Sequence, residues 1–203
     1  ASVAQLIADS AESLSHNASG AQAWALNNPA VVLSPVRTTT DVTTLNADGS
    51  TTEVVTNTGA VANKTTTTTS GDGKTVTVTY DIDGNGVVDQ KSVTTKNADG
   101  SVTRTLSDLT STGTVSHNKT VTTSADGLGQ TVSYDTDGNG SANKTVTDQT
   151  TLNANGSKTT VERTSTVNSG GTLVLSAATQ TDTSADGLTV TTKWDQTGSG
   201  TFT

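Results

Sequence analysis

The sequence contains no cysteine and no methionine, and it has only two prolines and five aromatic residues among 203. The lack of cysteine excludes disulfide bonds and zinc–thiolate sites. The basic residues are scattered singly, so the sequence lacks the basic cluster that a nucleic-acid backbone requires. The most apolar run, AWALNNPAVVLSPV, is interrupted by Asn27, Asn28 and Pro29 and is too short to span a membrane. We therefore expect neither nucleic-acid binding nor membrane insertion.

What the chain does contain is threonine and aspartate. The formal net charge is −8, and the acidic residues are sixteen aspartates and three glutamates. Aspartate beside glycine is typical of turns and of cation sites with oxygen ligands. Threonine supplies 47 residues, and it alternates with valine in a period of two that favours β-strands. We therefore predict an all-β protein with a thin hydrophobic core.

Residues 1–37 differ from the rest of the chain. Five apolar residues fall on one face of a helix: Val3, Leu6, Ile7, Ala11 and Leu14. Ser2 and Gln5 have the spacing of a capping box. We predict a short N-terminal helix and linker that cap the open end of a β array, with a partner-binding helix as the alternative.

From residue 38 onward the sequence repeats itself. NADGS occurs at 46 and 97 and NANGS at 153, while SGDG at 70 is matched by SADG at 124 and 184. Tyr80, Tyr134 and Trp194 each follow a glycine by seven residues, and they are 54 and 60 residues apart. We predict three β repeats, at residues 38–90, 91–145 and 146–203.

Each repeat has the pattern of four strands joined by turns. In the first repeat the strand segments TTDVTTLN, STTEVV, KTTTTT and KTVTVTY are separated by ADG, a variable connector and GDG. On the last strand of each repeat, apolar residues share one face and threonines fill the other: Val76, Val78 and Tyr80; Val132 and Tyr134; Leu188, Val190 and Trp194. A unit of this size with one aromatic residue is marginal alone. We therefore predict an elongated array of tandem antiparallel β-meander repeats, stabilised by their neighbours or by a bound cation.

The segment YDIDGNGVVD at 80–89 has the residue types and spacing of a calcium loop. In loops of the D-x-D-x-N-G type, oxygens at positions 1, 3 and 5 converge on the ion, and position 7 offers its backbone carbonyl. The predicted ligands are Asp81, Asp83, Asn85, the Val87 carbonyl and Asp89. An EF-hand would have glutamate where Ser92 stands and would have flanking helices, so we predict a metal loop between strands.

Two related loops follow with fewer carboxylates. The second, YDTDGNGSAN, offers Asp135, Asp137, Asn139, the Ser141 carbonyl and Asn143. The third keeps Asp195, with Thr197 and Ser199 at the next positions. Because calcium affinity follows ligand charge, we predict the tightest binding at the first loop, weaker binding at the second and none at the third. The alternative is a set of plain hairpin turns, since DG and NG are strong turn signals.

The segments NADGSVTRTLSD and TTSADGLGQTVSYDTDGNG resemble the Thr- and Asp-rich tandem repeats of very large bacterial proteins exported by type I secretion. Proteins of this kind often also carry calcium-binding RTX repeats and include adhesins. The resemblance covers residues 38–203, although the RTX nonapeptide G-G-x-G-x-D is absent. It implies a secreted, cell-surface location. It also implies metal-loop roles for Asp81, Asp83, Asn85 and Asp89, and for Asp135, Asp137 and Asn139.

Repetition without an aromatic-rich pocket favours a structural role. We predict an extender module, in which calcium-rigidified repeats hold a terminal domain away from a bacterial surface. The alternative is an adhesion module that binds a glycan or protein through its variable connectors, where loops tolerate change. His117, Trp24 and Trp194 are the unusual side chains available to it.

Two other functions are disfavoured by the sequence. Runs such as TTTTT suggest ice binding, but repeats of unequal length and interruptions by Lys, Arg and Glu argue against regular rows of threonine. Catalysis is disfavoured because the two histidines lie in unrelated contexts, and neither a nucleophile elbow nor a phosphate loop is present. We therefore predict that the protein is not an enzyme.

Overall fold

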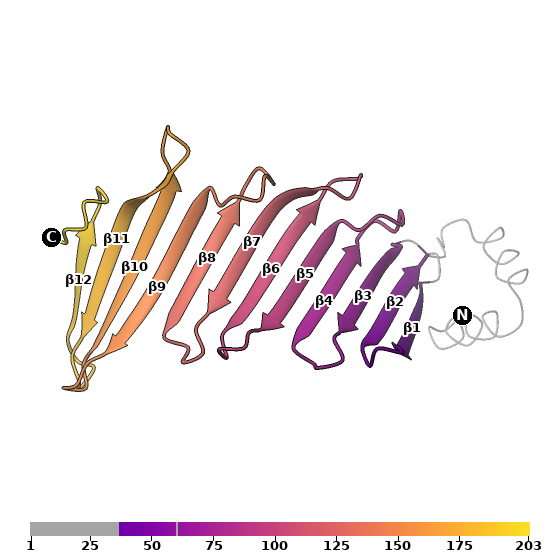
Figure 1. The fold of residues 1–203 in the computed structure, drawn as a ribbon, viewed down its shortest axis with the longest axis horizontal. Coiled ribbons are helices and arrows are strands. Elements are labelled where there is room, and N and C mark those ends of the chain that lie inside the picture. Colours follow the sequence, from indigo (N-terminus) through magenta and orange to yellow (C-terminus); the bar gives the residue numbers. More distant parts are fainter. Residues whose placement is uncertain (1–36, 60) are drawn as a thin grey trace, which may run out of the picture. The chain divides into compact units, whose positions relative to one another are not determined.

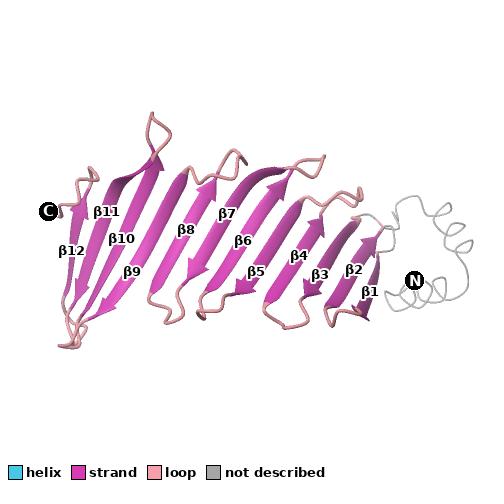
Figure 2. Cartoon of the chain, in the orientation of Figure 1, coloured by secondary structure: helices cyan, strands magenta, loops and turns pink. Residues whose placement is uncertain are grey.

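The computed structural model describes residues 37–59 and 61–203, which form one antiparallel β-sheet of twelve strands. The strands lie in the sheet in chain order, so each strand pairs with the strands before and after it (Figure 1). These residues contain strands and loops and no helix (Figure 2), and hence no helix able to span a membrane. The all-β prediction is confirmed as a meander. The cap predicted at residues 1–37 lies outside the described residues apart from Arg37.

Each predicted repeat contributes four strands of six to eleven residues. The bounds are β1 Thr38–Leu45, β2 Thr51–Thr58, β3 Asn63–Thr69, β4 Thr75–Asp81, β5 Gln90–Lys96, β6 Val102–Leu109, β7 Val115–Thr123, β8 Gly129–Asp135, β9 Lys144–Leu152, β10 Lys158–Val167, β11 Leu173–Thr183 and β12 Val190–Asp195. Alternating β-branched residues therefore fold as the period of two predicts.

The sheet continues without a break across the predicted repeat boundaries. Tyr80 of β4 lies opposite Gln90 of β5, and Tyr134 of β8 lies opposite Lys144 of β9, each at one end of a regular ladder. The described repeats therefore form one continuous ribbon and not separate β domains. At about 4.8 Å between neighbouring strands, twelve strands extend for about 50 Å.

Short turns join the strands along one edge of the sheet. In the turn at 46–50, Asp48 Oδ1 accepts hydrogen bonds from the backbone N–H and the hydroxyl of Ser50, at 3.0 and 2.7 Å. Asp99 makes the same two bonds with Ser101. The Ser50 hydroxyl and then its N–H lower the pKa of Asp48. These carboxylates are held by their own turns, as expected for simple hairpins.

Neither face of the sheet is covered by a second layer within the described residues (Figure 1). Ala178, 5% exposed, is the only buried apolar side chain among them, and the other buried side chains are polar. The core is therefore even thinner than the sequence predicts. Backbone ladders and cross-strand side-chain pairs must supply most of the stability that an enclosed core provides elsewhere.

The pairing register divides the strand side chains into two faces. Tyr80, Tyr134 and Trp194 share one face, which we call the aromatic face, because residues opposite each other across a ladder point the same way. The other face is rich in threonine, and we call it the threonine face. The alternation of apolar residues and threonines predicts a half-buried last strand in each repeat. This is wrong for the third repeat, where Leu188 precedes β12 and is 85% exposed, and Trp194 is 52% exposed. The reason is that β12 has a strand neighbour on one side only.

Candidate metal site

The first aspartate loop, residues 82–89, joins β4 to β5 at the edge opposite the short turns. Asp81 is the last residue of β4, and Asp89 directly precedes β5. The Asp89 N–H donates to the Tyr80 carbonyl at 2.8 Å, and the Asp89 carbonyl accepts from the Leu109 N–H at 2.8 Å. Both ends of the loop are therefore fixed by the β ladder.

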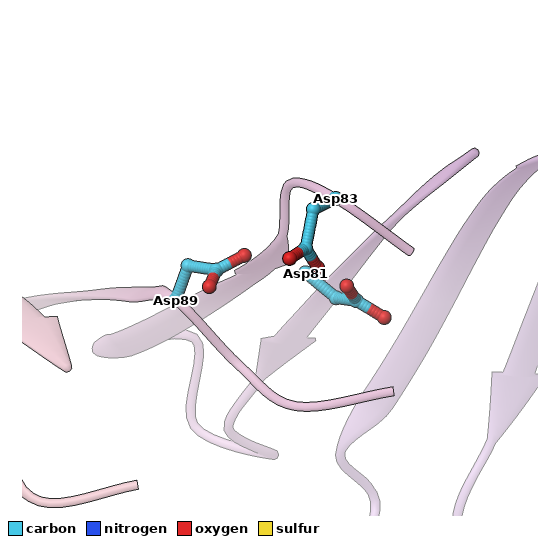
Figure 3. A group of neighbouring side chains, drawn as sticks. All are labelled: Asp81, Asp83 and Asp89. Atoms are coloured by element: carbon cyan, nitrogen blue, oxygen red, sulfur yellow. The ribbon is translucent and has the colours of Figure 1, made fainter. Parts of the chain in front are cut away.

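Three predicted ligands come together in this loop. One carboxylate oxygen from each of Asp81, Asp83 and Asp89 lies within 4.8 Å of the others, and Figure 3 shows the side chains of Asp83 and Asp89 pointing toward each other. Calcium binds oxygen at about 2.4 Å, which allows about 4.8 Å between ligands on opposite sides of the ion. The cluster could therefore hold one metal ion.

Asp81 is the buried member of the cluster, at 7% exposed. Its Oδ2 accepts a hydrogen bond from the Gly86 N–H at 2.9 Å. Its Oδ1 is buried and has no hydrogen-bond partner, and it is the only such side-chain nitrogen or oxygen in the described part of the chain. Leaving a buried acceptor without a hydrogen bond lowers the stability of the fold by about 1–3 kcal/mol. A bound cation or another donor at Oδ1 would remove this cost, and the described residues do not supply one.

The remaining predicted ligands are held by hydrogen bonds within the loop. Asp83 accepts from the backbone N–H and the side-chain amide of Asn85, at 3.1 and 2.9 Å. Asn85 Oδ1 accepts from the Val87 N–H at 2.7 Å, and Asp89 Oδ2 accepts from the Ile82 N–H at 2.6 Å. Asn85 therefore lies beside the cluster with its oxygen already bonded. As ligands, Asn85 and the Val87 carbonyl stay predictions.

Gly84 is a functional position that the sequence reasoning missed. Its φ is 71°, and a Cβ at this position would lie 2.5 Å from the Ala62 Cβ of the preceding connector. Gly138 occupies the same position in the second loop, where a Cβ would collide with the Val115 and Ser116 carbonyls. The signal was present in the sequence, because glycine stands at position 4 of all three loops. This glycine allows each loop to pack against the backbone beside it.

In the second loop the first aspartate is fully hydrogen-bonded. Asp135 is 6% exposed; its Oδ1 accepts from the Gly138 N–H at 2.8 Å and its Oδ2 from the Gly140 N–H at 2.9 Å. Burial raises the pKa of Asp135, but hydrogen bonds, led by that from Gly140, outweigh burial and leave the pKa lowered. This carboxylate, unlike that of Asp81, has a partner for each oxygen.

The other predicted ligands of the second loop repeat the first with one charge fewer. Asp137 accepts from the Asn139 amide at 2.9 Å, and Asn139 accepts from the Ser141 N–H at 2.7 Å. Asn143 stands in place of a third aspartate and accepts from the Thr136 N–H at 2.6 Å. These three hydrogen bonds have counterparts in the first loop, whereas the third carboxylate does not. The Ser141 carbonyl stays a prediction as a ligand.

The third loop satisfies its single aspartate entirely from within. Asp195 is 2% exposed, and Oδ1 accepts from the N–H groups of Thr197 and Ser199 at 3.0 and 3.2 Å. Oδ2 accepts from the Gly200 N–H at 2.6 Å. Burial raises the pKa of Asp195, but these bonds, with that from Gly200 the strongest, outweigh it and lower the pKa to about 2. The loop is closed around an ionised carboxylate by its own N–H groups.

No protein-family model matches the chain, and no curated protein matches it either. The resemblance to Thr- and Asp-rich secreted repeats therefore stays a prediction. The described residues establish a cluster of three carboxylates that could hold a metal ion, followed along the same edge by two loops whose first aspartate is satisfied internally.

Proposed function

We propose that residues 38–203 form a stiff spacer of a secreted bacterial surface protein, braced by calcium in the first aspartate loop. The observation that carries this proposal is the buried Asp81 carboxylate: its Oδ1 has no hydrogen-bond partner, and one of its oxygens lies within 4.8 Å of oxygens of Asp83 and Asp89. Three carboxylates at this separation repel one another unless a cation neutralises them. An oxygen-rich, anionic cluster of this size is the donor set that calcium prefers.

The position of the cluster supports a bracing role. Asp81 ends β4 and Asp89 precedes β5, so a cation held by both would tie together two strands that belong to different predicted repeats. The backbone of Asp89 is bonded to Tyr80 and to Leu109, which extends the connection to β6. In a sheet without an enclosed core, such a link would restrain twisting and fraying at this edge.

The expected energy is large enough to matter. Extracellular calcium modules have dissociation constants of about 10⁻⁴ to 10⁻³ M. A hundredfold excess of calcium over that constant stabilises the folded form by about 2.7 kcal/mol. Domains are typically stable by about 5–15 kcal/mol. Such a chain would be weakly folded in a calcium-poor cytosol and firm outside the cell, which suits export before folding.

The sheet architecture supports a spacer in a second way. Because strands follow one another in chain order, each added repeat lengthens the ribbon without changing the strands already present. Four strands per repeat give about 19 Å of length. The reach of such a protein would therefore scale with its number of repeats.

Calorimetric titration of the whole chain with calcium tests the metal site. We expect one dominant site in the unmodified protein and its loss in the D81N/D83N double variant. Asp99→Asn is the matched control, because it removes a carboxylate at a turn where Asn155 naturally occupies the equivalent position. Equal binding by the unmodified protein and the double variant would refute the site. A compact sphere in solution scattering with calcium would refute the spacer.

A second candidate function is ligand binding, favoured by a depression beside Tyr134. Its volume is about 390 Å³ and its lining includes His117, Lys119 and Leu106. The Nζ atoms of Lys119 and Lys144 lie 5.6 and 5.9 Å from the centre of the Tyr134 ring. His117 and Lys119 lie in the variable connector of the second repeat, DLTSTGTVSHNK at 108–119, and both belong to strand β7. A glycan array without hits, or hits unchanged in Tyr134→Ala, would exclude it.

A further inference from the structure

The register of the sheet aligns threonines from different repeats into regular rows. One row on the threonine face crosses β4 to β9 without interruption: Thr75, Thr95, Thr103, Thr122, Thr131 and Thr147. The adjacent row crosses the same strands: Thr77, Val93, Thr105, Thr120, Ser133 and Thr145. We call these twelve positions the threonine patch. None is charged, and eleven carry a hydroxyl group.

This alignment removes one objection to regular threonine rows, the unequal length of the repeats. The patch lies next to the edge with the short turns. Along that edge, each of the five turns from β1 to β10 has five residues: 46–50, 70–74, 97–101, 124–128 and 153–157. Differences in repeat length therefore fall at the other edge and in the longer strands of the third repeat. Of the interrupting charges, Glu53, Arg104 and Glu162 lie on the aromatic face. Lys91 and Arg163 lie on the threonine face at the border of the patch, Lys91 opposite Thr79 and Arg163 opposite Thr147.

The patch is both accessible and ordered. Its side chains are half-buried by their neighbours in the sheet, and no described element covers them. The hydroxyls of Thr103 and Thr122 lie 3.2 Å apart, and those of Thr105 and Thr120 lie 3.1 Å apart, so cross-strand contacts fix their directions. Threonine is also stiff at χ1. The axes of strands β4 to β9 have nearly the same tilt in Figure 1, so the spacing along the two rows changes little from strand to strand.

The spacing of the rows matches a property of ordered water. Neighbouring strands are about 4.8 Å apart, and residues two apart on one strand are about 6.8 Å apart. Water molecules in a tetrahedral network, joined by O–H···O bonds of about 2.75 Å, place second-neighbour oxygens about 4.5 Å apart. The difference of about 0.3 Å per strand adds up to about 0.6 Å across three strands and about 1.5 Å across six, so a row of threonine hydroxyls can stand in register with a row of lattice oxygens over about three neighbouring strands.

We infer that the threonine patch binds ice, a function distinct from the metal-braced spacer. The absence of charged side chains from the threonine patch favours a neutral ligand. The chain carries a net charge of −8 and displays Arg104, Lys119 and Lys144 on the aromatic face, yet the patch carries none. Within the twelve positions a charged glycan or nucleic acid would find no complementary group; the nearest basic groups, Lys91 and Arg163, lie at the border of the patch. Ice is neutral and offers hydrogen-bond donors and acceptors at equal spacing, as the hydroxyls do.

Thermal hysteresis and the shaping of single ice crystals test this inference on the full chain in calcium buffer. Thr122→Lys places an ammonium group in the centre of the patch, opposite Thr103 and Thr131. Burying that charge against ice costs more than the 1.4 kcal/mol that corresponds to a tenfold change, so we expect hysteresis to fall at least about tenfold. Thr123→Lys is the matched control, since it is the adjacent residue of the same strand on the opposite face, and we expect it to leave hysteresis unchanged.

Three results would overturn the inference: no hysteresis or shaping by the unmodified protein, equal loss in both lysine variants, or a dimer in sedimentation that Thr122→Lys dissociates without any ice activity. The last result would assign the patch to a second copy of the chain. Circular dichroism establishes that each variant folds, and Thr131→Lys in β8 replaces Thr122→Lys if the latter does not. Because calcium titration is measured separately, failure here leaves the proposed metal site unaffected.

Discussion

The first and third aspartate loops differ in how they stabilise a buried aspartate carboxylate. Both follow an aromatic residue and begin with a buried aspartate. Both end at a residue whose backbone N–H donates to the carbonyl of that aromatic residue, Asp89 to Tyr80 and Thr203 to Trp194. In the third loop, backbone N–H groups occupy both oxygens of Asp195. In the first, Asp81 keeps one oxygen unpaired and gains two neighbouring carboxylates. The backbone shape therefore does not require a metal, and the demand for one comes from the number of charges and from the unpaired oxygen.

The largest effect is expected when the first loop is given side chains of the third, which tests whether the number of carboxylates determines calcium binding. Asp83→Thr with Asp89→Thr leaves Asp81 alone, as Asp195 is alone in its loop. Because affinity follows ligand charge, we expect calcium binding to weaken about a hundredfold or more. Calorimetry measures the loss, and circular dichroism measures whether the sheet persists. Retained affinity would mean that the carboxylates are not the ligands.

The second loop allows the opposite change. Asn143→Asp places a third carboxylate where the first loop has Asp89, and we expect calcium affinity at this loop to rise about tenfold. Asn155→Asp is the control, since it adds the same charge at a turn where Asp48 and Asp99 occur naturally. A titration with two comparable sites in the first variant and one in the second is the expected result. An identical titration for both variants would contradict the assignment of position 9 as a ligand.

Much of this comparison could be read from the sequence, because local patterns determine it. The period of two and the DG turns predicted every strand pair within a repeat, and aspartates at positions 1, 3 and 9 predicted the cluster in the first loop. The continuity of the sheet could not be predicted, since the pairing of β4 with β5 leaves no periodic signal. Nor could the unpaired oxygen of Asp81 be foreseen. It depends on the N–H groups at positions 3 to 5 of the loop. Those of Thr197 and Ser199 donate to Oδ1 of Asp195 in the third loop, whereas the Asn85 N–H donates to Asp83 in the first.

A smaller effect should separate the two glycines of the first loop. Gly84→Ala must accommodate a Cβ 2.5 Å from that of Ala62, whereas Gly86→Ala faces open space. Both have positive φ, at 71° and 88°, so both substitutions incur the left-handed cost of about 1–2 kcal/mol. We expect Gly84→Ala to cost about 1–3 kcal/mol more, through overpacking against the connector. Denaturant unfolding of the two variants measures the difference, and equal costs would show that the contact with Ala62 relaxes freely.

The smallest expected effect is the contribution of Asp195, in the third loop, to the pH dependence of stability. The pKa of Asp195 is lowered to about 2 in the folded state, whereas an unfolded aspartate has a pKa of about 3.9. A folded pKa below the unfolded one means that the carboxylate stabilises the protein above pH of about 4 and loses this contribution as the pH falls toward about 2. Other turn aspartates also have lowered pKa values, so the total pH profile does not isolate Asp195. The difference in unfolding free energy between the unmodified protein and Asp195→Asn does isolate it. That difference should be constant above pH of about 4 and shrink below it, and a difference that stayed constant down to pH of about 2 would show that backbone N–H groups, although close, do not hold the ionised form.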